Sequence, residues 1–248
     1  MSFARVLFTV VFVAVIPGVA LGPSAAQASG VDAPPGMTGL AQVANTFGSP
    51  PHTWRVGVDV GAFWSELRFD NGVSSRLQQT AVTGVVEFVP LERVTFQLVV
   101  GSLLGGTVDE NRRSFGFQPG WIGGGSVSYA LVEGRGARPF VLVSVGVVAS
   151  STVTAEEDGP HAFHGLDARL SLAVGKTFFR IFSPYAVARG FLGSATWERL
   201  SRTSVGTDVH HFQLGAGAHV RVWEGLDVFA EGAPLGEQRV TGGVGYAF

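Results

Sequence analysis

The chain has 248 residues, of which 35 are glycine and none is cysteine, with 46% hydrophobic and 15% charged residues and a formal net charge of −2 at pH 7. Without cysteine there is no disulfide framework and no cysteine-based zinc site, and without an excess of basic residues there is no electrostatic footprint for nucleic acid. High glycine content with few charges is unusual for a soluble enzyme, but it is typical of strands whose side chains alternate between lipid and a crowded interior.

Residues 1–28 have the features of a secretory signal peptide. Arg5 supplies a positive charge, an apolar run follows, and Ala26 and Ala28 form an A-x-A cleavage site before Ser29. An uncleaved anchor helix is the alternative, but Pro17 interrupts the run, which is shorter than the roughly 20 residues that a spanning helix needs. No cysteine follows the cleavage site, which excludes a lipoprotein. We therefore expect an exported mature chain that begins at residue 29.

Residues 29–52 are rich in proline, glycine and alanine and contain one charged residue. This composition predicts a periplasmic linker. Within it, the stretch 37–47 (MTGLAQVANTF) leaves open a short helix or a plug at the mouth of the following domain, which spans 53–248.

The first predicted strand covers residues 53–64 (TWRVGVDVGAFW) and alternates strictly between two faces. One face carries Trp54, four small apolar residues and Trp64, whereas the other carries Arg55 and Asp59. At ~3.3 Å per residue and a tilt near 40°, the two tryptophans stand roughly 25 Å apart along a membrane normal. This spacing predicts an aromatic girdle residue at each membrane interface; a strand of a soluble sandwich is the alternative interpretation.

Similar alternation recurs along the rest of the chain and predicts further strands around residues 82–88, 94–104, 121–131, 140–149, 166–174, 185–197, 212–222, 226–233 and 239–248. Short joins at 90–92, 133–137, 180–183 and 223–225 alternate with longer polar loops at 65–75, 105–117, 151–163 and 199–207, with 234–237 as a short exception. Such alternation is typical of transmembrane barrels. The prediction is an all-β, antiparallel, up-and-down transmembrane β-barrel of ten strands, with eight as the alternative.

The polar faces of these strands carry charges of both signs. Because an eight- to ten-stranded barrel is barely wider than its own side chains and an unpaired buried charge is costly, we expect these groups to pair and plug the lumen. A narrow ion path or small-ligand site is the alternative. The predicted lumen network contains Arg55, Asp59, Glu87, Arg93, Asp167, Arg169, Arg221, Glu231 and Arg239.

Arg189 lies within the strand 185–197, on the same face as its large apolar residues. Because a lipid-facing arginine near the middle of a bilayer would cost ~2 to 4 kcal/mol, we expect Arg189 to point into the lumen and the small residues of this strand to face outward with Leu192. A bulge that switches the two faces is the alternative.

The C-terminal strand ends on Val244, Tyr246 and Phe248, which alternate on one face. This pattern, together with the signal peptide and about ten amphipathic strands, resembles the outer-membrane β-barrel family, in particular the small OmpA/OmpX-like barrels. The resemblance implies that these three residues form the assembly signal that the barrel-assembly machinery recognises. It also implies an outer-membrane location in a Gram-negative-type envelope, contact with outer-membrane lipid and lipopolysaccharide, periplasmic termini and a monomer.

The sequence predicts no enzyme and no cofactor. Among outer-membrane barrel enzymes, lipid A deacylases and phospholipases use a His-x-Ser pair on a strand, and none of the six histidines here has serine two residues later. A pair of His210 or His211 with Asp208, similar to that of omptin proteases, and a surface cation site at 156–164 are weaker alternatives. The favoured function is a structural or loop-mediated interaction role with a plugged lumen. A narrow channel or small-solute transporter, and a soluble β-sandwich or lipocalin-like binder, stay open.

Overall fold

The computed structural model describes residues 43, 53–111, 113–134, 138–156, 159–199 and 202–248. Antiparallel strands make up nearly all of this part of the chain. Their bounds are β1 (Trp54–Phe69), β2 (Ser74–Leu91), β3 (Val94–Glu110), β4 (Arg113–Phe117), β5 (Gly120–Glu133), β6 (Phe140–Glu156), β7 (Gly159–Gly175), β8 (Phe182–Arg199), β9 (Arg202–Asp208), β10 (Phe212–Arg221), β11 (Leu226–Gly236) and β12 (Gln238–Ala247). Within the described ranges, no helix is long and apolar enough to span a membrane.

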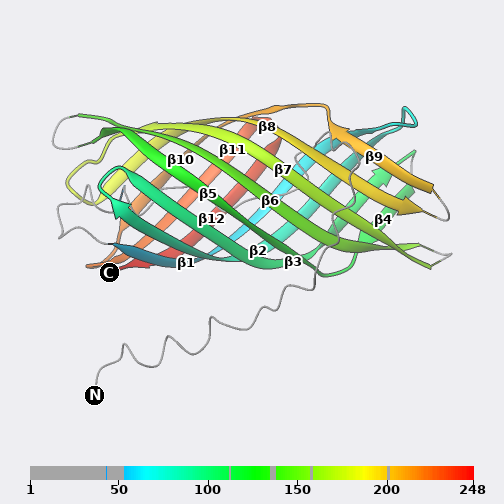
Figure 1. Cartoon of the computed structure of the whole chain (residues 1–248), viewed down its shortest axis with the longest axis horizontal. Helices are drawn as coiled ribbons and strands as arrows, with labels where there is room; N and C mark the ends of the chain where they lie inside the picture. Colours follow the sequence, from blue (N-terminus) through cyan, green and yellow to red (C-terminus); the bar gives the residue numbers. More distant parts are fainter. Residues whose placement is uncertain (1–42, 44–52, 112, 135–137, 157–158, 200–201) are drawn as a thin grey trace, which may run out of the picture.

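The strands close into a barrel, because β1 pairs on one side with β2 and on the other with β12 (Figure 1). β4 and β5 both lie between β3 and β6, and β9 and β10 both follow β8 on the same side. The twelve described strands therefore occupy ten positions around the barrel, which confirms the predicted antiparallel barrel and its strand number. Closure gives every strand two neighbours, so no edge leaves unpaired N–H and C=O groups.

The ring changes its strand number along the barrel axis. We call the end with Trp54 and Phe248 the terminal end and the opposite end the far end. The β11–β12 hairpin turns at Gly236, which has a φ of 80°, before it reaches the far end. Beyond the hairpin, β9 pairs directly with β1, with Leu67 opposite Asp208 and Phe69 opposite Gly206. Ten strands thus surround the terminal half, and eight surround the far end: β1, β2, β3, β4, β6, β7, β8 and β9.

The prediction of long loops was wrong: strands occupy most of the residues at 65–75, 105–117, 151–163 and 199–207. β1 runs on to Phe69, β3 to Glu110 and β8 to Arg199, and each is joined by a few residues to a partner strand that starts equally far out (Figure 1). We call this extension of the wall the collar. On β1 its outward residues Glu66 and Arg68 are polar, while its inward residues Leu67 and Phe69 are apolar. Alternation therefore continues into the collar, but with the polar side outward.

Between the collar and the terminal end, the outward side chains form a belt of exposed apolar residues around the barrel. On β1 the belt runs from Trp54 to Trp64, and on β7 it runs from Leu166 to Val174. The C-terminal strand adds Val244, Tyr246 and Phe248 to the belt at the terminal end. An exposed apolar surface of this extent is what a barrel presents to lipid hydrocarbon.

Candidate functional site

The barrel interior holds most of the predicted lumen charges. Seven of the nine are at most 8% exposed: Arg55, Asp59, Glu87, Asp167, Arg169, Glu231 and Arg239. Arg221 is half-buried at the terminal end, opposite Asp227 in the β10–β11 ladder. Arg93 lies outside the lumen, because its side chain is 51% exposed and its Nε donates to Glu133 Oε1 at 2.7 Å. Arg93 stands at the start of a strand, where a long side chain reaches the solvent rather than the interior.

A first charge cluster lies near the terminal end and is centred on Arg55. The Arg55 guanidinium donates from Nη2 to Asp227 Oδ1 at 2.7 Å and from Nε to Oδ2 at 3.0 Å, a bidentate contact. Its Nη1 lies 3.5 Å from Glu87 Oε2, and His219 Nε2 lies 3.0 Å from Asp227 Oδ1. Asp59, two inward positions beyond Arg55 on β1, is buried beside this cluster. Asp227 was not predicted, although it shares the inward face of β11 with Glu231, four residues further along.

A second cluster lies deeper and is centred on Glu231. Its carboxylate accepts from Arg239 Nη2 at 2.6 Å, from Arg189 Nη2 at 3.0 Å and from the Tyr185 hydroxyl at 3.1 Å, and its Oε1 lies 2.8 Å from Arg189 Nη2. Arg189 also donates from Nη1 to Gln213 Oε1 at 2.7 Å. Arg189 therefore points into the lumen, as expected, and Leu192 of the same strand faces outward. One buried carboxylate holds two guanidinium groups in this cluster.

A third set of polar groups lies where the ring narrows from ten strands to eight. Arg169 pairs with Asp167 of its own strand, and the Ser65 hydroxyl donates to Asp208 across the β1–β9 seam. Glu237, at the turn of the β11–β12 hairpin, is also buried. These groups complete a polar layer that spans the middle of the lumen.

Two apolar clusters share the interior with these polar groups. At the terminal end, the cluster comprises Val43, Ala130, Phe140, Leu142, Ala173, Tyr185, Val187 and Phe229. Val43 is the only described residue of the predicted linker; it has helical geometry and is 1% exposed. It therefore lies against the barrel interior, as the plug alternative for stretch 37–47 implies. The neighbouring residues of that stretch and the predicted signal peptide lie outside the described residues.

The collar encloses a second apolar cluster, formed by Phe63, Leu67, Phe69, Leu77, Val108, Phe117, Phe163, Ala195 and Trp197. Trp197 is at its centre: its ring meets Phe69, Phe115 and Phe163 at centroid distances of 5.9, 5.5 and 6.1 Å. The indole N–H donates to the Thr154 hydroxyl at 3.1 Å. The sequence analysis did not predict this cluster, because five of its nine members (Leu67, Phe69, Val108, Phe117 and Phe163) fall in segments interpreted as loops.

Arg199 covers this cluster from the far side. Its guanidinium lies 4.0 Å from the centroid of the Trp197 ring and donates to Glu110 Oε2 at 2.6 Å and to Glu156 Oε1 at 3.1 Å. Burial lowers the pKa of Arg199, but the hydrogen bonds to the two carboxylates outweigh burial and hold this pKa above its ordinary value. The contact joins β8, β3 and β6 across the mouth of the collar.

In the described part of the chain, no group of three or more His, Asp or Glu residues could hold a metal ion. His210 and His211 are exposed, whereas Asp208 is buried and accepts from Ser65. The ring of His210 packs edge-on against Phe212 at 6.3 Å. The residues of the omptin-like alternative therefore do not form a shared site.

A closed antiparallel barrel with an apolar outer belt and a polar interior defines the fold of an outer-membrane β-barrel. No protein-family model matches the sequence, and no curated protein is significantly similar to it. Among solved structures, the outer-membrane protease OmpT from Escherichia coli has a TM-score of 0.53 and 10% identity, covering 79% of this chain and 97% of that chain. At this identity the likeness concerns the fold.

Two further solved structures are similar at lower TM-scores. The translocator domain of the autotransporter NalP from Neisseria meningitidis has a TM-score of 0.47 and 15% identity, over 83% of this chain and 92% of that one. The N-terminal barrel of Pseudomonas aeruginosa OprF has a TM-score of 0.35 and 14% identity, over 77% and 97%. The special likeness to OmpA/OmpX-type barrels that the sequence suggested is not shown by these comparisons.

Proposed function

We propose that the protein is an integral outer-membrane barrel with a closed lumen, exported by the signal at 1–28 and inserted with both termini in the periplasm. It acts structurally or through the collar and the short turns at its far end, and it is not an enzyme. The outward belt supports insertion, because the exposed Trp54 and Trp64 on β1 lie roughly 25 Å apart along the membrane normal, the height of an outer-membrane apolar band. The collar then projects beyond the outer surface.

The observation that supports the closed lumen is that side chains fill it along its length. Buried charge clusters and the terminal-end apolar cluster occupy the ten-stranded half, and the collar cluster occupies the eight-stranded far end. Barrel diameter grows roughly linearly with strand number. The step from ten strands to eight therefore narrows the cross-section at the collar to about two-thirds, where Phe117, Phe163 and Trp197 fill it. Ions would have to cross the collar cluster.

Closed-barrel insertion is tested first by gel mobility of the outer-membrane fraction, boiled and unboiled in detergent. We expect the unboiled protein to migrate faster, because a closed barrel stays compact in detergent. A soluble protein without any mobility shift would contradict the membrane proposal and favour the sandwich alternative.

Lumen closure is tested separately in a planar bilayer. We expect no discrete conductance steps from the wild-type protein. Discrete steps would overturn the closed lumen and favour the channel alternative. Any such channel should prefer cations, because the buried set contains seven carboxylates (Asp59, Glu87, Asp167, Asp208, Asp227, Glu231 and Glu237) against four guanidinium groups (Arg55, Arg169, Arg189 and Arg239).

A further inference from the structure

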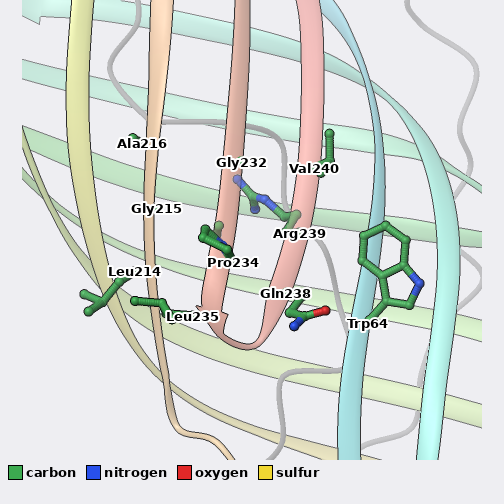
Figure 2. A pocket seen from close by; sticks show the side chains of 11 residues that line it. Trp64, Leu214, Gly215, Ala216, Gly232, Pro234, Leu235, Gln238, Arg239 and Val240 are labelled. Atoms are coloured by element: carbon green, nitrogen blue, oxygen red, sulfur yellow. The ribbon is translucent and has the colours of Figure 1, made fainter.

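A hollow of about 750 Å³ lies on the outer wall of the barrel at the step from ten strands to eight. Trp64 of β1 stands on one side of it and Leu214 of β10 on the other, and the β11–β12 hairpin forms its floor (Figure 2). Its volume is within the range of small-molecule sites, about 300–1,000 Å³.

The hollow exists because the wall is built from small residues at this point. Ala216 and Gly232 face each other across the β10–β11 ladder, and the register of that ladder shifts between Leu214 and Ala216. A Cβ added at Gly232 would meet no atom within 4 Å. The floor is therefore open on its outer side, while Leu214, Leu235 and Val240 on the rim are exposed.

The chemistry of the hollow is apolar, with one polar position at its edge. Gln238, which is exposed, lies opposite Trp64 in the β1–β12 ladder. Arg239 belongs to the same hairpin, but its guanidinium turns into the lumen, where Nη2 donates to Glu231 (Figure 2). The outer side of the hollow is therefore an uncharged hydrocarbon surface. The amide of Gln238 and the indole of Trp64 lie at its edge, at the level where the belt ends.

We propose that this hollow binds one acyl chain of a membrane lipid, whose ester and head group lie beside Gln238 and Trp64. The proposal rests on membrane insertion, as put forward above, and extends it to a defined lipid site. The hollow is continuous with the belt that faces hydrocarbon, where water is not available to fill it and an unfilled gap forfeits dispersion contacts.

A single chain fits the shape of this hollow better than a second barrel does. Trp64 and Leu214 flank the floor on two sides, so the convex wall of another copy would meet these side chains before it reached Gly232 (Figure 2). A flexible chain of methylene groups can lie between them. The amide of Gln238 and the indole N–H of Trp64 supply hydrogen-bond donors suited to ester oxygens.

The test is native mass spectrometry of the delipidated, folded protein titrated with dipalmitoyl phosphatidylethanolamine. Gly232→Leu fills the hollow from its floor. Gly84→Leu is the matched control, because Gly84 also lies on an outward position of the belt, on β2, and its nearest atom to an added Cβ is 3.6 Å away. Both variants are first checked for the mobility shift on boiling, which separates loss of folding or insertion from loss of the site.

We expect the wild-type protein and Gly84→Leu to retain one lipid equivalent with the same affinity, and Gly232→Leu to bind it at least about tenfold more weakly, equivalent to ~1.4 kcal/mol. Equal lipid binding by all three proteins would overturn the proposal. A wild-type dimer that becomes monomeric only in Gly232→Leu would also overturn it, in favour of a second copy as the occupant.

Discussion

Replacing Glu231 with glutamine tests whether the charge layer stabilises the barrel. The carboxylate accepts from Arg189 at 3.0 Å and from Arg239 at 2.6 Å, and all three side chains are buried. Glutamine has almost the same shape, so the substitution creates no cavity, but it leaves two guanidinium groups without their counter-charge. Breaking a buried pair from one side costs about 3–5 kcal/mol. Because the amide oxygen still accepts one hydrogen bond, we expect a loss of about 3 kcal/mol in the free energy of unfolding.

The measurement is urea unfolding in phospholipid vesicles, followed by tryptophan fluorescence. The double variant Glu231→Gln with Arg239→Gln removes one charge of each sign, and we expect it to be more stable than the sum of the two single losses predicts, by about 1 kcal/mol or more. The exposed pair of Arg93 with Glu133 supplies a control, because Arg93→Gln should leave the unfolding midpoint unchanged. A loss below about 1 kcal/mol for Glu231→Gln, or strict additivity in the double variant, would refute the reasoning.

Three further predictions concern the collar, the wall and the C-terminus. Trp197→Ala should lower the free energy of unfolding by about 3–5 kcal/mol, measured in the same assay; a loss below about 1 kcal/mol would show that the collar cluster is loosely packed. Gly106→Ala should lower the free energy of unfolding by about 1–3 kcal/mol or more, because the added Cβ would lie 2.0 Å from the Gln78 carbonyl oxygen. Gly116→Ala is the control and should lower it far less, because its added Cβ would meet no atom within 4 Å. Phe248→Ala should reduce the amount of barrel assembled in the outer membrane, measured by the boiling shift in membrane fractions, while the purified protein refolds normally in detergent; an unchanged amount in the membrane would argue against an assembly signal.

The belt was predictable from the sequence because lipid imposes a simple rule on it. Outward residues such as Val58 and Val60 must be apolar, and inward residues such as Asp59 need not be, so period-two alternation is visible without any structure. The same rule predicted that Arg189 points inward. Each of these inferences needed only the parity of a residue within its strand.

The collar was not predictable in the same way. There the outside faces water and the inside is an apolar core, as in a soluble barrel, so the polarity of the two faces is exchanged at Glu66 and Leu67. The segment that contains the polar residues Glu66 and Arg68 was interpreted as a loop, although Leu67 and Phe69, which alternate with them, are apolar. The partners of each ion pair could not be predicted from the sequence either. Arg55 and Asp227 are 172 residues apart, and only closure of the barrel brings them together.

Two strands, β12 and β9, share the side of β1 that faces away from β2, which has a consequence for the alignment of the barrel seam. Residues 55–64 of β1 pair with β12, whereas residues 67–69 pair with β9. A strand with one partner can slide along it in two-residue steps that keep every side chain on its own face. Here such a slide against β12 would also pull Phe69 away from Gly206 and Ser65 away from Asp208. This seam is thus held in register by two separate segments of chain, and a shift against one of them breaks the contacts with the other.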